Sequence, residues 1–237
     1  MENITHTLAG VALANAFFRG RAGRAAVPIL AAASNLPDLD VLVHLTGDPA
    51  AVTLRRSFGH SLLILPAACL LLALLLRRFQ PRLGLPLLSG MVAAGVGAHL
   101  LFDLINSFGV LLLWPASLWR PELSMVFIVD LILTALLAAP LLLSLPRALR
   151  PRLRTLSRAA LAAAAVYLAV CGTGRLLAAG ELRRAADRDG LRPEFTYVFP
   201  EPLGPHRWRG VARQDGVYSL YLLFPFGTGG ADGAVPA

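Results

Sequence analysis

Long apolar runs, separated by short basic or turn-forming segments, dominate the first three quarters of the chain. A helix needs about 20 residues to cross roughly 30 Å of hydrocarbon. Two shorter runs, near 4–18 and 25–36, flank the sequence RGRAGR and predict a helical hairpin that is either re-entrant or buried. Four later runs are long enough to span a membrane, and we expect full transmembrane helices near 58–79, 86–113, 123–146 and 157–180.

The pattern changes after residue 180. The stretch ELRRAADRDGLRPEF is polar, and HRWRGVARQDGVYSLYLLF predicts two strands joined by a turn at Asp215-Gly216. The sequence therefore predicts an all-α polytopic membrane protein with a small β-rich C-terminal segment. We divide it into a helical domain over 1–180, a β-hairpin domain over 181–228 and a disordered tail over 229–237.

Composition and charge support a membrane location. The chain is 56% hydrophobic and only 15% charged, whereas about a quarter of the residues in soluble domains are charged. The net charge of +8 comes from arginines clustered between the apolar runs. This distribution is typical of cytoplasmic loops, and no nucleic-acid-binding module is present. With the arginine clusters inside, the β-rich segment is expected to be extracytoplasmic.

Polar side chains interrupt the apolar runs at one common depth in this topology. His99 and Asp103 lie one helical turn apart on the same face. Imidazole and carboxylate groups together suit Zn²⁺, with Mn²⁺ and Fe²⁺ as alternatives, and seven candidates allow one or two ions. The candidate ligands are His6, Asp38, Asp40, His60, His99, Asp103 and Asp130.

A pair of metal ions is a common device for hydrolysing phosphoesters, and it needs a bridging carboxylate. Asp38 and Asp40, in the sequence NLPDLD, are the natural choice and are therefore the catalytic candidates. Arg55 and Arg56 precede His60, and guanidinium groups bind phosphate in a bidentate manner. Because Asn106 extends the face that carries His99 and Asp103, we assign it with the two arginines to substrate binding.

Each of these motifs also has a simpler interpretation. His99 and Asp103 are compatible with a buried polar pair that holds helices together. The PDLD sequence is typical of a turn followed by a helix cap. Asp130 is a weaker candidate, since it would serve equally in a second shell or beside an arginine. The convergence of all these groups at one depth favours a shared site.

Four segments resemble the YdjM-like family of inner-membrane proteins, which are regarded as membrane-bound metal-dependent hydrolases. The matching segments are THTLAG, NLPDLD, RRSFGHSLL and GAHLLFDLINSFGVLLLWP, so the resemblance extends to about residue 145. It implies a multi-pass protein of the bacterial inner membrane. The residues that match the family's polar pattern are His6, Asp38, Asp40, His60, His99 and Asp103.

The first functional hypothesis is therefore a hydrolase that acts on an ester or phosphoester, with a phospholipid or another anionic lipid as substrate. A proton- or metal-coupled transporter is the main alternative, since intramembrane histidines and aspartates also carry protons and ions. Transporters of this kind often contain two repeated halves, and the sequence has no such repeat. A non-catalytic membrane protein that binds a partner through its C-terminal segment is the third hypothesis.

Overall fold

The fold begins with a helical hairpin at the N-terminus. The computed structural model describes residues 1–46, 55–202, 204–227 and 232–236. α1 (Asn3–Leu13) starts where the Glu2 carboxylate accepts a hydrogen bond from the Thr5 amide, and it continues through the π-helical turn η1 (Ala14–Phe18) into α2 (Arg19–Ala22). Gly23, with a φ of 61°, reverses the chain. The 3-10 turn η2 (Gly23–Ala25) then leads into α3 (Ala26–Ala33), which packs against α1.

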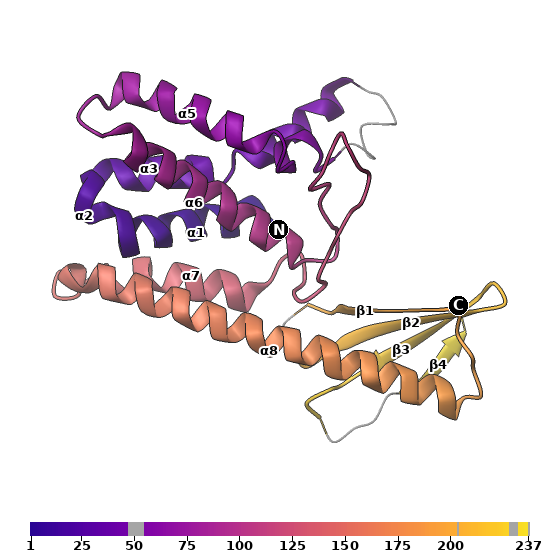
Figure 1. The fold of residues 1–237 in the computed structure, drawn as a ribbon. Coiled ribbons are helices and arrows are strands. Elements are labelled where there is room, and N and C mark those ends of the chain that lie inside the picture. The colour runs from indigo at the N-terminus through magenta and orange to yellow at the C-terminus, as the bar shows by residue number, and fades with distance from the viewer. Residues whose placement is uncertain (47–54, 203, 228–231, 237) are drawn as a thin grey trace.

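The remaining helices complete a two-layer bundle. The 3-10 segments η3 (Pro37–Thr46) and η4 (Phe58–His60) precede α5 (Leu65–Phe79) and α6 (Leu85–Leu104). α7 (Leu131–Leu143), the 3-10 turn η5 (Arg150–Arg152) and α8 (Leu153–Arg188) follow. Figure 1 shows α7 and α8 side by side below α1, and α6 packs against α1, α3 and α5.

The prediction of four full transmembrane helices is wrong. Among the described residues, only α6, with 20 residues, and the 39-residue segment Arg150–Arg188 are long and apolar enough to cross a membrane. α5 has 15 residues and α7 has 13. At about 1.5 Å per residue, these two helices reach roughly 22 Å and 20 Å, short of the hydrocarbon thickness.

The helices are shorter because the apolar runs contain helix boundaries that hydropathy does not detect. The run 58–79 becomes α-helical only at Leu65, next to Pro66 at the first turn. The run 86–113 stops being helical after Leu104, and the chain continues as irregular backbone. The run 123–146 becomes helical only after Asp130, whose carboxylate caps α7. Irregular backbone remains viable here because it is hydrogen-bonded internally, for example from the Met125 amide to the Ile105 carbonyl at 2.7 Å.

The C-terminal residues form an antiparallel sheet in the order β1-β2-β3-β4. Its strands are β1 (Phe195–Pro200), β2 (Trp208–Gln214), β3 (Val217–Leu223) and β4 (Asp232–Pro236). Asp215 and Gly216 both have positive φ, at 51° and 78°, and join β2 to β3 as the sequence predicted. β4 lies within the stretch expected to be a tail, of which residues 229–231 and 237 are outside the described residues.

The sheet packs against the C-terminal part of α8, which runs through the expected domain boundary at residue 181 (Figure 1). Trp208, Tyr221 and Leu223 from the sheet are buried together with Leu182 of the helix. Tyr197 of β1 donates a hydrogen bond to Glu122, and burial together with this carboxylate raises the pKa of Tyr197 to about 12. The sheet thus contacts both α8 and the irregular segment between α6 and α7.

The outward faces of the helices carry large apolar side chains. Leu71 on α5, Leu142 on α7 and Leu176 on α8 are 66%, 63% and 71% exposed. Unpaired apolar surface of this extent is unusual for a protein surrounded by water but is expected where helices face lipid. The surface therefore agrees with a membrane environment for the helical layers.

Candidate metal centre

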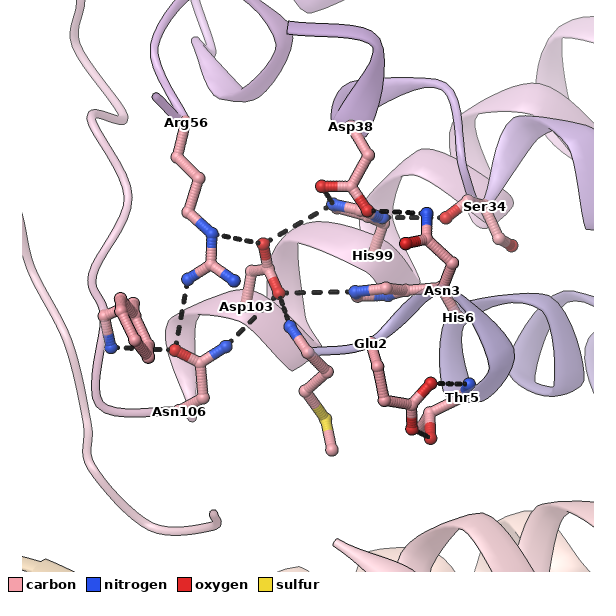
Figure 2. Close-up of polar contacts among 12 residues, drawn as sticks. Glu2, Asn3, Thr5, His6, Ser34, Asp38, Arg56, His99, Asp103 and Asn106 are labelled. Carbon is pink, nitrogen blue, oxygen red and sulfur yellow. Dashed lines mark hydrogen bonds and ion pairs between the residues drawn. The ribbon is translucent and has the colours of Figure 1, made fainter. Parts of the chain in front are cut away.

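Four segments that are distant in the sequence bring polar side chains to one buried point. α1 supplies His6, η3 supplies Asp38, η4 supplies His60, and α6 supplies both His99 and Asp103. His6, His60, His99 and Asp103 have fully buried side chains, whereas that of Asp38 is 23% exposed. Figure 2 shows His6 and Asp38 converging on the α6 pair. The packing of α3 against α1 and α6 holds these segments together.

The centre of the group consists of two imidazole nitrogens and two carboxylate oxygens. His60 Nε2 lies 3.1 Å from His99 Nε2 and 3.1 Å from Asp103 Oδ2. His99 Nε2 lies 3.6 Å from Asp103 Oδ2 and 3.7 Å from Asp38 Oδ1. Each of the four residues offers a ligand atom within 4.8 Å of the other three. The group Asp38, His60, His99 and Asp103 is called the His-Asp cluster below.

These separations fit a divalent metal ion. A tetrahedral ion bonded at about 2.0–2.1 Å places its ligand atoms roughly 3.3 Å apart. The measured separations of 3.1–3.7 Å lie close to that value. Two nitrogens and two carboxylate oxygens are a ligand set suited to Zn²⁺ and, with lower affinity, to Mn²⁺ or Fe²⁺. The cluster is therefore a group that could bind a metal ion. Its geometry suits more than one of these ions.

Hydrogen bonds behind the two histidines fix how their rings face the cluster. His99 Nδ1 lies 2.7 Å from the Ser34 carbonyl oxygen, which can only accept, so Nδ1 donates and Nε2 keeps a free lone pair. His60 Nδ1 lies 2.9 Å from Asp40 Oδ2 and is oriented in the same way. Orientation by a carbonyl or a carboxylate behind the ring is the usual arrangement at metal-ligating histidines. Asp40 was expected to be a metal ligand, but it instead contacts the Nδ1 atom of His60.

His6 occupies the edge of the cluster. Its ring stacks on the His99 ring with centroids 3.8 Å apart, and its Nε2 lies 3.3 Å from Asp103 Oδ1. That contact lacks hydrogen-bond alignment, so within the described part of the chain neither ring nitrogen of His6 has a hydrogen-bond partner. A buried imidazole without partners is costly unless it has another role. His6 therefore lies beside the cluster but outside the four residues whose ligand atoms lie within 4.8 Å of one another.

Asp103 connects the cluster to the residues expected to bind substrate. Arg56 Nε lies 3.1 Å from Asp103 Oδ2, and Arg56 Nη1 donates to Asn106 Oδ1 at 3.2 Å. Asn106 in turn donates to Asp103 Oδ1 at 3.3 Å (Figure 2). Arg56 is 6% exposed, whereas Arg55 lies at the surface. The buried pair supports Asp103, and the surface arginine is the one open to a ligand.

Asp130 is not brought to the His-Asp cluster. Its Oδ1 accepts from the Leu133 amide at 2.8 Å, and its Oδ2 accepts from the Tyr167 hydroxyl at 2.7 Å. The first contact caps α7, and the second ties α7 to α8. The structure thus gives this carboxylate a structural position that satisfies both of its oxygens.

Three supporting groups could not be assigned from the sequence. Ser34 acts through its backbone carbonyl, which leaves no side-chain signal. Asn3 donates to Asp38 Oδ2 at 3.0 Å, and the Met1 amino group contacts Asp103 (Figure 2). The polar residues before THTLAG were the only available hint of the last two contacts. Met1 and Asn3 lie at the start of the N-terminal hairpin, and the packing of α1 against α6 brings them near Asp103 and Asp38.

Comparison with known proteins gives one match. A family model described as YdjM inner membrane protein matches residues 1–178, which is more than half of the chain. The matched region contains the helical layers and all residues of the His-Asp cluster. Searches among curated proteins and solved structures found no match.

Proposed function

The chain belongs to the YdjM inner membrane protein family, and on that premise we propose that it is a metal-dependent hydrolase of the inner membrane. The observation that carries the proposal is the convergence of His60 Nε2, His99 Nε2 and Asp103 Oδ2 within 3.1–3.6 Å, with both Nδ1 atoms already satisfied. Two imidazole nitrogens and a carboxylate oxygen held together in a buried site match the needs of a cation.

In this proposal His60, His99, Asp103 and Asp38 hold one divalent ion, with Zn²⁺ as the first choice. When bound, such an ion would lower the pKa of a water molecule far below its ordinary value, so that hydrolysis could proceed at neutral pH. Asp38 is the partly exposed member, so the substrate approaches from its side. Asp40 keeps the His60 ring in place, and Arg56 and Asn106 hold Asp103. Arg55, at the surface, meets an anionic group of the substrate.

A lipid substrate is supported by an apolar groove between α5 and α6. The groove has a volume of about 440 Å³ and is lined by residues that include Leu62, Leu65, Val96 and Leu100. Leu62 follows His60 by two residues, and Leu100 is the neighbour of His99. The groove would hold an acyl chain, and α6, which forms one of its walls, also carries His99 and Asp103. We therefore propose an ester or phosphoester of a phospholipid as the substrate class.

The first experiment measures metal in detergent-purified protein by inductively coupled plasma mass spectrometry. About one equivalent of a transition metal is expected in the wild type. His99→Ala should lose it, because the ion then lacks one nitrogen ligand. His206→Ala is the matched control, since His206 is exposed in the C-terminal region and should leave the metal content unchanged.

Activity is then measured on phospholipid vesicles with the metal-loaded proteins. Metal-dependent release of a hydrolysed product by the wild type and by His206→Ala, absent in His99→Ala, would support the hydrolase. Well-folded wild type that takes up no metal would refute the metal mechanism. Metal-dependent ion flux in proteoliposomes, without any hydrolysis, would favour the transporter instead.

A further inference from the structure

A cavity with basic and apolar walls lies at the end of the helical layers that is away from the His-Asp cluster. Its volume is about 700 Å³, and it forms where α2 and the preceding π-helical turn meet the connection between α7 and α8. In Figure 1 these segments lie at the end of the bundle away from the N-terminus, whose amino group contacts the His-Asp cluster. The residues that matter to the argument are Asn15, Arg19, Leu141, Leu145, Arg150 and Arg154. We call this space the arginine cavity.

The arginine cavity has a positive charge that its own walls do not compensate. Arg19, Arg150 and Arg154 line it, and none of the lining residues is acidic. In the part of the chain that the structure describes, neither Arg150 nor Arg154 forms an ion pair with a carboxylate. All three arginines are also open to solvent, and positive charges that line one hollow without counter-charges attract an anion.

One of these arginines is held in place by a buried side chain. Asn15 is only 3% exposed, and its Oδ1 accepts a hydrogen bond from Arg19 Nη1 at 2.8 Å. The amide group of Asn15 is itself fixed, because its Nδ2 donates to the Val11 carbonyl at 3.0 Å. Arg19 is thereby ordered at the cavity wall before any ligand arrives, which reduces the entropy cost of binding.

The π-helical turn over Ala14–Phe18 shapes the same wall. Turns of this kind inside α-helices occur frequently at functional sites. Arg158 of α8 reinforces the turn, since its Nε donates to the Ala16 carbonyl at 3.1 Å and its guanidinium lies 5.6 Å from the Phe17 ring centroid. Arg158 is thus engaged in the wall, while Arg150 and Arg154 stay available.

The other walls are apolar. Apolar lining comes from Leu141 near the end of α7, Leu145 just after it and Leu153 at the start of α8. Guanidinium groups recognise phosphate through paired, charge-assisted hydrogen bonds, and leucine side chains suit an acyl or glycerol moiety. Basic pockets between transmembrane helices bind the headgroups of anionic lipids. We propose that the arginine cavity binds the phosphate group of an anionic phospholipid, at a site separate from the His-Asp cluster.

The test measures binding of phosphatidylglycerol to the full-length protein in detergent by native mass spectrometry. Phosphatidylcholine is the zwitterionic control, and glycerol phosphate is the soluble source of the same phosphate chemistry. Arg150→Gln with Arg154→Gln removes two charges from the cavity. Arg147→Gln with Arg152→Gln is the matched control, because all four arginines are exposed but Arg147 and Arg152 do not line the cavity.

Wild type and the control variant should bind phosphatidylglycerol, while the cavity variant should bind about tenfold more weakly. Leu141→Trp, which narrows the cavity and keeps every charge, should also weaken binding. Glycerol phosphate that competes at equal affinity would support the site and assign its ligand to the soluble phase. Equal binding by both double variants, or by phosphatidylcholine, would overturn the proposal. None of these readouts depends on metal or on hydrolysis.

Discussion

Gly59 allows two backbone segments of the His-Asp cluster to approach each other. A Cβ atom added at Gly59 would lie 2.1 Å from the Pro37 carbonyl oxygen. Gly59 directly precedes His60, and Pro37 directly precedes Asp38, so this contact sets the separation of two proposed ligands. Backbone cannot move aside as a flexible side chain can, and any larger residue must push η3 and η4 apart.

We therefore expect Gly59→Ala to destabilise the protein by about 1–3 kcal/mol and to lower its metal content. The measurements are the thermal unfolding midpoint in detergent and metal analysis of the purified protein. Gly97→Ala is the control, because a Cβ atom at that position on α6 meets nothing within 4 Å. Unchanged metal binding by Gly59→Ala would contradict the geometry of the cluster.

Residue by residue, the structure brings most of the predicted site residues together but gives some of them contacts other than those expected. His99 and Asp103 were expected on one helical face, and they lie there on α6. Asp40 and Arg56 were expected at the metal and at the substrate, yet they contact His60 and Asp103. Spacing along a chain shows which residue types can meet. It does not show which of two neighbouring carboxylates reaches the centre.

Among the structural elements, α7 has one of the predicted ligands, Asp130, at its N-terminus and away from the His-Asp cluster. Asp130 is a carboxylate like several other candidates, but both of its oxygens are used within the α7–α8 pair. Its carboxylate accepts from the first turn of α7, which is the usual role of aspartate before a helix. That role also explains why the apolar run around it is not helical from its beginning.

Asp130→Ala should cost about 1 kcal/mol of stability through the lost cap, while the metal content stays at the wild-type level. Asp130→Asn should retain most of the stability, since its amide oxygen can still accept from the Leu133 amide. Thermal unfolding and metal analysis on the same preparations check both effects. Loss of metal in Asp130→Asn would instead return this residue to the list of ligands.

For the whole molecule, α8 is the element that joins the membrane-associated layers to the sheet. Its N-terminal half packs on α1 and α7, and its C-terminal half packs on β1, β2 and β3. Trp208 is fully buried at the second contact. The sheet therefore has its own core and shares no residue with the His-Asp cluster.

Trp208→Ala should destabilise the sheet by about 3–5 kcal/mol, because it leaves a large cavity against α8. Limited proteolysis should then cleave the chain after α8, while metal content remains unchanged. Trp119→Ala is the control, since Trp119 is 60% exposed. If Trp208→Ala also released the metal, the sheet and the cluster would be energetically coupled.

The sequence by itself indicated a membrane protein and the types of several of its elements. Apolar content predicted a membrane protein, the i,i+4 spacing predicted the α6 pair, and Asp215-Gly216 predicted the hairpin of β2 and β3. The helical spacing and the hairpin turn are local features, because each depends only on residues that are close together in the sequence. The number of membrane-crossing helices was predicted wrongly for the same reason, since hydropathy records apolarity but not where a helix ends.

Only the tertiary structure decided which polar groups meet and where each helix stops. The Ser34 carbonyl reaches His99 across 65 positions, and His60 reaches Asp103 across 43. Contacts over such distances arise from the packing of α1, α3 and α6, which minimises exposed backbone and buries the small residues between them. The arginine cavity is likewise a product of packing, because its three arginines come from segments more than a hundred residues apart in the sequence.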